Sequence, residues 1–148
     1  MMNVYELYLE VILDHNRNPR NFYKMSQPDC EAEGVNPLCG DKIKLFITLD
    51  NNRIIDASFT GGGCAISTAS ASLMTENLKG KTIEDAKAIF KNFHRAITAN
   101  DAEAEKSLGK LAVLSGVKAF PVRVKCATLA WHTLLAAIEH SQEVVTTE

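Results

Sequence analysis

The feature that most constrains the fold is a change in the period of the hydrophobic pattern along the chain. Apolar and polar residues alternate in Lys42–Asp50 and again in Arg53–Thr60, which is typical of β-strands that bury one face. Asp50, Asn51 and Asn52 lie between the two runs and suit a tight hairpin turn. Most of the remaining sequence has apolar residues at helical spacing. We therefore expect an α+β fold with helices packed on a small antiparallel sheet.

Predicted helices flank the hairpin on both sides. One helix is expected before it, at Asn3–His15, and the stretch from there to about Glu33 has no regular pattern. The segments expected after it are a helix at Ala65–Leu78, a helix that starts at Thr82 and has its last buried residue at Ile97, a short helix or loop at Asn100–Gly109, a short helical piece at Lys110–Ser115, and a last helix from Pro121 or Cys126 to His140. No repeat or linker interrupts the 148 residues, so we expect residues 1–148 to form a single domain.

Composition and charge exclude several classes of protein. The formal net charge is −2 and the lysines are scattered, whereas a nucleic-acid surface would need a basic stripe. The N-terminus lacks the pattern of a secretory signal, and the longest apolar stretch, Cys126–Ile138, is too short to span a membrane. We therefore expect a cytoplasmic protein that binds neither nucleic acid nor membrane. Four separated cysteines in that reducing compartment favour metal or redox chemistry over disulfides.

Three of the cysteines lie in segments suited to a soft metal. Cys39 follows a proline turn and has Asp41 two residues on, while Cys64 and Cys126 precede Ala/Leu-rich stretches. A thiol at a helix N-terminus is favoured as the thiolate. The two ends of a hairpin lie at one edge of a sheet, so Cys39 and Cys64 should lie close together. We predict a Zn²⁺ site built from Cys39, Asp41, Cys64 and Cys126, although the gaps of 25 and 62 residues match no zinc-finger pattern.

The predicted site needs positive charge around it. Three thiolates and one carboxylate carry four negative charges, and Zn²⁺ neutralises two of them. Arg123 and Lys125 flank Cys126, and they would share one face if Val122–Lys125 were extended. The alternative is that both are solvated charges beside an unrelated cysteine. Cys30, in a polar stretch outside these segments, is expected to be an incidental thiol.

The residues around the three cysteines resemble a known family. Asn36-Pro37-Leu38-Cys39-Gly40-Asp41, Gly62-Gly63-Cys64-Ala65-Ile66-Ser67 and Val124-Lys125-Cys126-Ala127 are similar to the three cysteine motifs of the U-type iron–sulfur assembly proteins, the IscU/SufU family. The resemblance covers nearly the whole chain. It implies a three-stranded antiparallel sheet, with a short third strand near Gly34–Asn36 and helices on one face. It also implies that Cys39, Asp41, Cys64 and Cys126 converge on one exposed site.

Three departures from IscU indicate the SufU branch. Lys125 stands where IscU has a histidine, and Ala119-Phe120-Pro121-Val122-Arg123 replaces a Leu-Pro-Pro-Val-Lys segment. The stretch between Cys64 and Cys126 is also longer, with extra residues around Phe93–Ser115. The branch implies that the protein binds zinc, accepts sulfur from a pyridoxal-phosphate cysteine desulfurase and passes it to downstream iron–sulfur assembly proteins. We expect Cys39 to accept the sulfur, because it lies on a loop beside the exchangeable oxygen ligand Asp41.

Two alternatives stay open at the level of sequence. Thiolates also bind iron, so the same residues could hold a [2Fe–2S] cluster on a true scaffold. The zinc site could also be purely structural, in a domain that only docks partners. Metal content and a sulfur-transfer assay distinguish these three functions.

Overall fold

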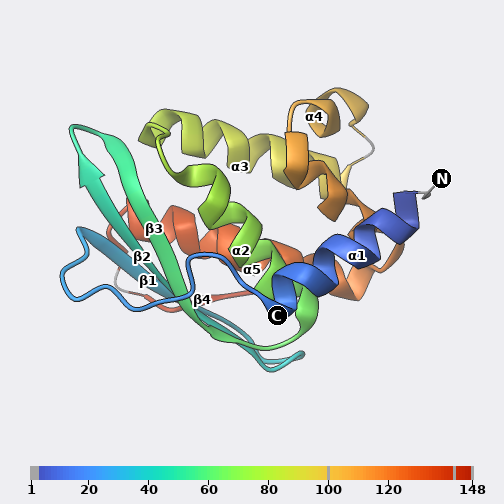
Figure 1. The fold of residues 1–148 in the computed structure, drawn as a ribbon, viewed down its shortest axis with the longest axis horizontal. Coiled ribbons are helices and arrows are strands. Elements are labelled where there is room, and N and C mark those ends of the chain that lie inside the picture. Colours follow the sequence, from blue (N-terminus) through green and yellow to red (C-terminus); the bar gives the residue numbers. More distant parts are fainter. Residues whose placement is uncertain (1–3, 100, 142, 148) are drawn as a thin grey trace.

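A computed structural model describes residues 4–99, 101–141 and 143–147, and in it helices cover one face of a small sheet (Figure 1). The predicted α+β class is confirmed. None of the described helices is long and apolar enough to cross a membrane.

The central hairpin forms as predicted. Strand β2 (Asp41–Asp50) pairs antiparallel with strand β3 (Arg53–Gly62). The turn residues Asn51 and Asn52 have φ angles of 49° and 70°, and a two-residue turn with positive φ at both positions matches the twist of the strands. Odd-numbered residues of β2 such as Ile43, Leu45 and Ile47 are fully buried.

The sheet has two features that the sequence did not indicate. Strand β1 (Cys30–Asn36) pairs antiparallel with β2 along its whole length, so it is longer than the predicted Gly34–Asn36. A short fourth strand, β4 (Val145–Thr146), runs parallel to β1. The strand order is therefore β3-β2-β1-β4, and the expected three-stranded antiparallel sheet was incomplete. Cys30, expected in a loop, is a buried residue of β1.

Helix contacts explain why a strand forms in the weakly apolar β1 sequence. A Cβ added at Gly34 would stand 2.1 Å from Thr133 Oγ1. Helix α5 therefore approaches the strand as closely as a glycine allows, and β1 is held by tertiary packing rather than by its own β-propensity.

The helices follow the predicted order, with small shifts at their ends. They are α1 (Val4–Arg17), α2 (Ala65–Leu78), α3 (Ile83–Thr98), α4 (Ala102–Lys106), the 3₁₀ helix η1 (Gly109–Ala119) and α5 (Pro121–Ile138). Thr82 caps α3, its Oγ1 accepting from Asp85 N at 3.0 Å. Helices α2 and α5 pack in the centre of the molecule, where Trp131 Nε1 donates to Ser70 Oγ at 3.2 Å.

The start of α5 matters most for the site. Of the two predicted starts, Pro121 is the one observed, and proline suits the first turn because its missing N–H would be unpaired there. Val122–Lys125 are therefore helical, so the condition under which Arg123 and Lys125 would share one face of an extended segment is not met. Cys126 consequently lies in the second turn of α5, not ahead of the helix.

Candidate metal centre

The predicted ligands come from three separate parts of the fold that meet at one end of the hairpin. Cys39 lies in the turn between β1 and β2, Asp41 is the first residue of β2, and Cys126 lies in α5. The sulfurs of Cys39 and Cys126 are 3.2 Å apart. Ligand atoms of Cys39, Asp41 and Cys126 all lie within 4.8 Å of one another. The structure thus brings three of the four predicted ligands into one group.

Asp41 connects Cys64 to that group. The residue is 2% exposed, and its Oδ1 accepts a hydrogen bond from Cys64 N at 2.7 Å. Asp41 Oδ2 lies 3.8 Å from Cys64 Sγ. Cys64 itself is outside the set whose ligand atoms all lie within 4.8 Å of one another. Asp41 therefore joins Cys64 to the group, and Cys64 is also close enough to raise the pKa of the Cys126 thiol.

The three cysteines are held in different ways. Cys64 is the N-cap of α2, as predicted, and its Sγ accepts from Ser67 N at 3.4 Å. Cys126 is fully buried in the helix, where Asn36 Nδ2 contacts its Sγ at 3.6 Å. Burial raises the pKa of the Cys126 thiol, and the neighbouring Cys39 and Cys64 raise it further. The expected support from a helix N-terminus therefore applies to Cys64 and not to Cys126.

Arg123 is the cation that the structure places at the sulfurs. Its Nη1 lies 3.6 Å from Cys39 Sγ and 4.0 Å from Cys126 Sγ, because residues three apart on a helix share a face. The hydrogen bond to Cys126 and the nearby thiols raise the pKa of the Arg123 guanidinium. Lys125 is exposed, and no contact joins its ammonium group to the described cysteines.

Two further residues shape the site: Asn36, which received no role from the sequence, and Gly63, in a glycine run expected to let the backbone approach a metal or partner closely. Asn36 is almost fully buried, contacts Cys126 Sγ through Nδ2, and leaves its Oδ1 without a hydrogen-bond partner among the described residues. Gly63 has a φ of +151°, and a Cβ there would stand 2.1 Å from Asp41 Oδ1. Both residues belong to the cysteine motifs. The sequence therefore contained the motif residues, but their contacts with Cys126 and Asp41 could be identified only from the structure.

The donor set fits zinc. Three free thiols and one carboxylate are ligands that zinc takes in proteins, and the buried Asp41 keeps one oxygen clear of the Cys64 N–H. Beside the thiols lies a cleft of about 710 Å³, which Cys39, Cys64 and Arg123 help to line. Its other walls include the apolar side chains of Leu38, 69% exposed, and Val122, 66% exposed. The site is therefore open to a partner on this side.

Comparisons with known proteins identify the family. Residues 7–146 match the family described as the NifU-like N terminal domain. The chain is 43% identical over 132 residues to the zinc-dependent sulfurtransferase SufU of Bacillus subtilis (strain 168), covering 89% of each chain. It is 40% identical to the iron–sulfur cluster assembly scaffold protein IscU of Streptococcus pyogenes serotype M1, over 91% of this chain and 84% of that one. A crystal structure described as an iron–sulfur cluster assembly scaffold protein for the SUF system (FiSufU), from Fervidobacterium islandicum AW-1, superposes with a TM-score of 0.83 at 36% identity, over 87% of this chain and 94% of that one.

Proposed function

Because the chain belongs to the family of NifU-like N-terminal domains, we propose that it is a zinc-bound sulfur acceptor of iron–sulfur cluster assembly. In this proposal a pyridoxal-phosphate cysteine desulfurase of the cytoplasm supplies persulfide sulfur, and downstream iron–sulfur assembly proteins receive it. The observation that carries the proposal is the group formed by Cys39, Asp41 and Cys126, with Arg123 at its sulfurs and an open cleft beside it. The relative named as a zinc-dependent sulfurtransferase supports the choice of chemistry.

Cys39, Asp41, Cys64 and Cys126 would hold the zinc. Bound there, the metal would keep the thiols deprotonated, which is the form that attacks sulfur. Arg123 offsets part of the negative charge from outside the ligand set, and Asn36 orients the buried sulfur of Cys126. Asp41 positions the start of α2 through its hydrogen bond to Cys64 N.

The transfer itself is a thiol–disulfide type of exchange. The thiolate of Cys39 attacks the outer sulfur of the partner's persulfide, so a new S–S bond forms on Cys39. The bond between the two sulfurs of the partner's persulfide breaks, and the partner's cysteine leaves as a thiolate. No external oxidant or reductant is needed, because one S–S bond replaces another.

Accessibility favours Cys39 as the acceptor. Cys126 is fully buried within α5, so a partner's persulfide has no path to it in this conformation. Cys64 is partly exposed, but its sulfur caps a helix through Ser67 N. Cys39 is also partly exposed, and it lies in a four-residue turn closed by the bond from Cys39 N to Asn36 O at 3.2 Å. A turn can move at lower cost than a helix end.

Exposed apolar side chains around the cleft suit a docking partner. Leu38 precedes Cys39 directly, and Phe120 and Val122 also line the cleft, at the start of α5. Apolar side chains that surround a reactive centre are typical of interaction surfaces. We propose that the desulfurase covers this cleft when its persulfide reaches Cys39.

Mass spectrometry of trapped persulfide tests the proposal. Zinc-loaded protein is incubated with a cysteine desulfurase and free cysteine, then digested without reductant. One extra sulfur atom is expected on the peptide that contains Cys39. Extra sulfur mainly on the Cys64 peptide would move the acceptor role to that residue, and desulfurase turnover unchanged by the protein would refute the acceptor function.

A scaffold function is the second candidate, because the chain is 40% identical to a relative named as an IscU scaffold. The metal content of protein purified without added metal separates the two. Stoichiometric zinc and sulfur acceptance support the acceptor, whereas a visible cluster chromophore supports the scaffold. Zinc without sulfur acceptance would indicate a structural site.

A further inference from the structure

Strand β1 is only partly covered along its outer edge. Strand β2 pairs with all seven residues of β1 on one side. On the other side, β4 pairs with Gly34 and Val35. Within the described parts of the chain, no residue pairs with the outer edge of residues 30–33. More than half of β1 is therefore a free sheet edge.

The direction of the free backbone groups follows from the pairing with the C-terminal segment. Val35 O accepts from Thr147 N at 3.2 Å. The backbone N–H and C=O of Val35 therefore point away from β2, toward the outer edge. Backbone groups alternate in direction along a strand, so the N–H and C=O of Glu31 and Glu33 face outward too. The parallel register of Gly34 with Val145 directs Val145 N to the C=O of Glu33. No described residue pairs with the N–H and C=O of Glu31 or with the N–H of Glu33 on this side. Two N–H groups and one C=O group are thus available for another strand.

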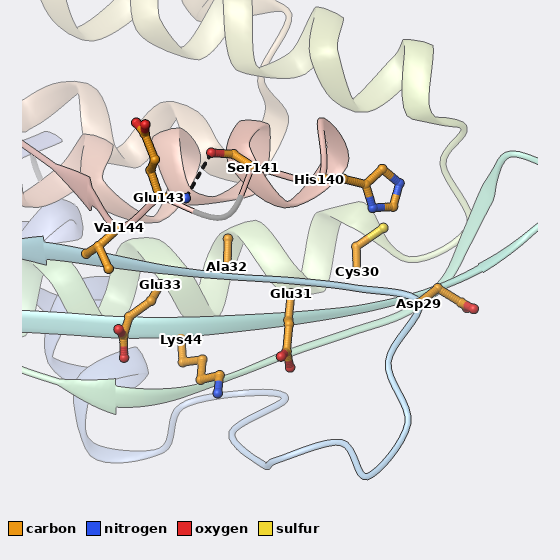
Figure 2. A pocket seen from close by; sticks show the side chains of 10 residues that line it. All are labelled: Asp29, Cys30, Glu31, Ala32, Glu33, Lys44, His140, Ser141, Glu143 and Val144. Atoms are coloured by element: carbon orange, nitrogen blue, oxygen red, sulfur yellow. Dashed lines mark hydrogen bonds between the residues drawn. The ribbon is translucent and has the colours of Figure 1, made fainter.

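There is open space beside these groups. A cleft of about 310 Å³ lies between this edge of β1 and the segment that follows α5, and its walls include His140, Ser141 and Glu143. Figure 2 shows Ala32 pointing toward the α5 side and Glu31 and Glu33 pointing to the opposite side of the sheet. The side chains of an added strand would therefore alternate between a small apolar surface and a pair of carboxylates.

Charge decides which kind of strand fits. Asp29, Glu31, Glu33 and Glu143 line the cleft, whereas Lys44 is the only lysine or arginine among its lining residues. Lys42 also approaches Glu33, at 3.7 Å, and the Lys42 side chain is largely in solvent while that of Glu33 is partly buried. A second copy of β1 paired antiparallel on this edge would place glutamates opposite glutamates, which is unfavourable. The edge therefore disfavours self-association and favours positive charge.

We propose that the outer edge of β1 binds an extended, basic segment of a partner protein as an added strand. Main-chain hydrogen bonds to Glu31 and Glu33 would supply the pairing, and alternate lysine or arginine side chains would meet their carboxylates. Residues between them would be small or apolar, to lie over Ala32. The chain already shows this mode of binding, since β4 adds to the neighbouring part of the same edge. The proposal does not depend on the metal centre.

The test uses the zinc-loaded full chain and a fluorescein-labelled peptide, Val-Lys-Val-Lys-Val-Lys. Fluorescence anisotropy measures binding, and amide hydrogen exchange measures protection of individual residues. In the free protein, the Glu31 and Glu33 amides should exchange at least about tenfold faster than the paired Ala32 amide. With saturating peptide, the Glu31 and Glu33 amides should become at least about tenfold slower.

Two controls separate strand addition from simple charge attraction. Only alternate backbone amides of the bound peptide would face the edge of β1. Two peptides are therefore compared, one N-methylated at its three valines and one at its three lysines. One of them should lose binding and the other should keep it. Glu31→Lys with Glu33→Lys should weaken binding at least about tenfold, and the matched pair Glu10→Lys with Glu103→Lys, at exposed positions on α1 and α4, should leave it unchanged. No binding at about 1 mM peptide, equal binding of both N-methylated peptides, or equal effects of the two charge-reversal pairs would each overturn the proposal.

Discussion

Substitution of Gly63 by alanine tests how tightly the candidate site is built. Gly63 has a φ of +151°, a conformation that side chains disfavour, and its Cβ would stand 2.1 Å from Asp41 Oδ1 and 2.6 Å from Asp41 Cα. The carboxylate oxygen could rotate away, but the Cα belongs to the first residue of β2 and cannot. The new methyl group must therefore displace Asp41, Gly63 or both.

The expected loss of stability has two parts. Holding a non-glycine residue in this backbone conformation costs about 1–3 kcal/mol. Displacing the carboxylate breaks its 2.7 Å bond with Cys64 N, and a hydrogen bond to a charged group contributes about 1.5–3 kcal/mol. We expect Gly63→Ala to lower the free energy of unfolding by about 3–5 kcal/mol, and to weaken zinc binding because Asp41 moves.

Gly40→Ala is the matched control. Gly40 lies between Cys39 and Asp41 and has a φ of +72°, but a Cβ there has nothing within 4 Å. This variant carries only the backbone strain, about 1–2 kcal/mol. Urea unfolding, with zinc and with a chelator, measures the stabilities, and competition with a chelator measures zinc affinity. Equal losses in the two variants would refute the contact between Gly63 and Asp41.

The remaining predictions address the metal, the cations and pH. Chelating the zinc should lower the melting temperature, because the thiols and carboxylate lose their shared cation; unchanged midpoints would show that the metal is not structural. Arg123→Ala should slow sulfur acceptance from a desulfurase more than Lys125→Ala, since the Arg123 guanidinium contacts the sulfurs. Burial lowers the pKa of the His15 imidazole in the folded protein. As the pH falls, His15 is therefore protonated in the unfolded chain before it is protonated in the folded one, and the free energy of unfolding should decrease below about pH 6.5. Urea unfolding at several pH values should show a shallower fall for His15→Gln.

The parts of the fold that were predictable are those with local causes. The hairpin follows from alternation and from Asn51-Asn52, which tolerate the positive φ that its turn needs. Cys64 could be placed at a helix start because a glycine run precedes it and an alanine-rich helix follows it. The predicted ligands Cys39 and Asp41 lie close together because they flank one turn.

The parts that could not be predicted depend on contacts far apart in the sequence. β1 contains alternating glutamates, an alanine and a glycine, and only its pairing with β2 and its packing against α5 make it a strand. β4 is a strand because it lies beside β1, which no local pattern reveals. The role of Arg123 depended on whether α5 starts at Pro121, since a helix and an extended segment direct the same residues differently.

That start of α5 also determines which thiol a partner can reach. If Cys126 stood ahead of the helix, as the sequence alone allowed, all three thiols would border the cleft. Instead it lies one turn inside α5, fully buried, with its sulfur against Cys39 and Asn36. Cys126 can then serve as the fixed point of the site, while Cys39, in its turn, meets solvent and Arg123. In the proposed transfer, a partner that approaches across Leu38 would meet Cys39 with Cys126 behind it, so the difference in burial would give the two cysteines separate tasks.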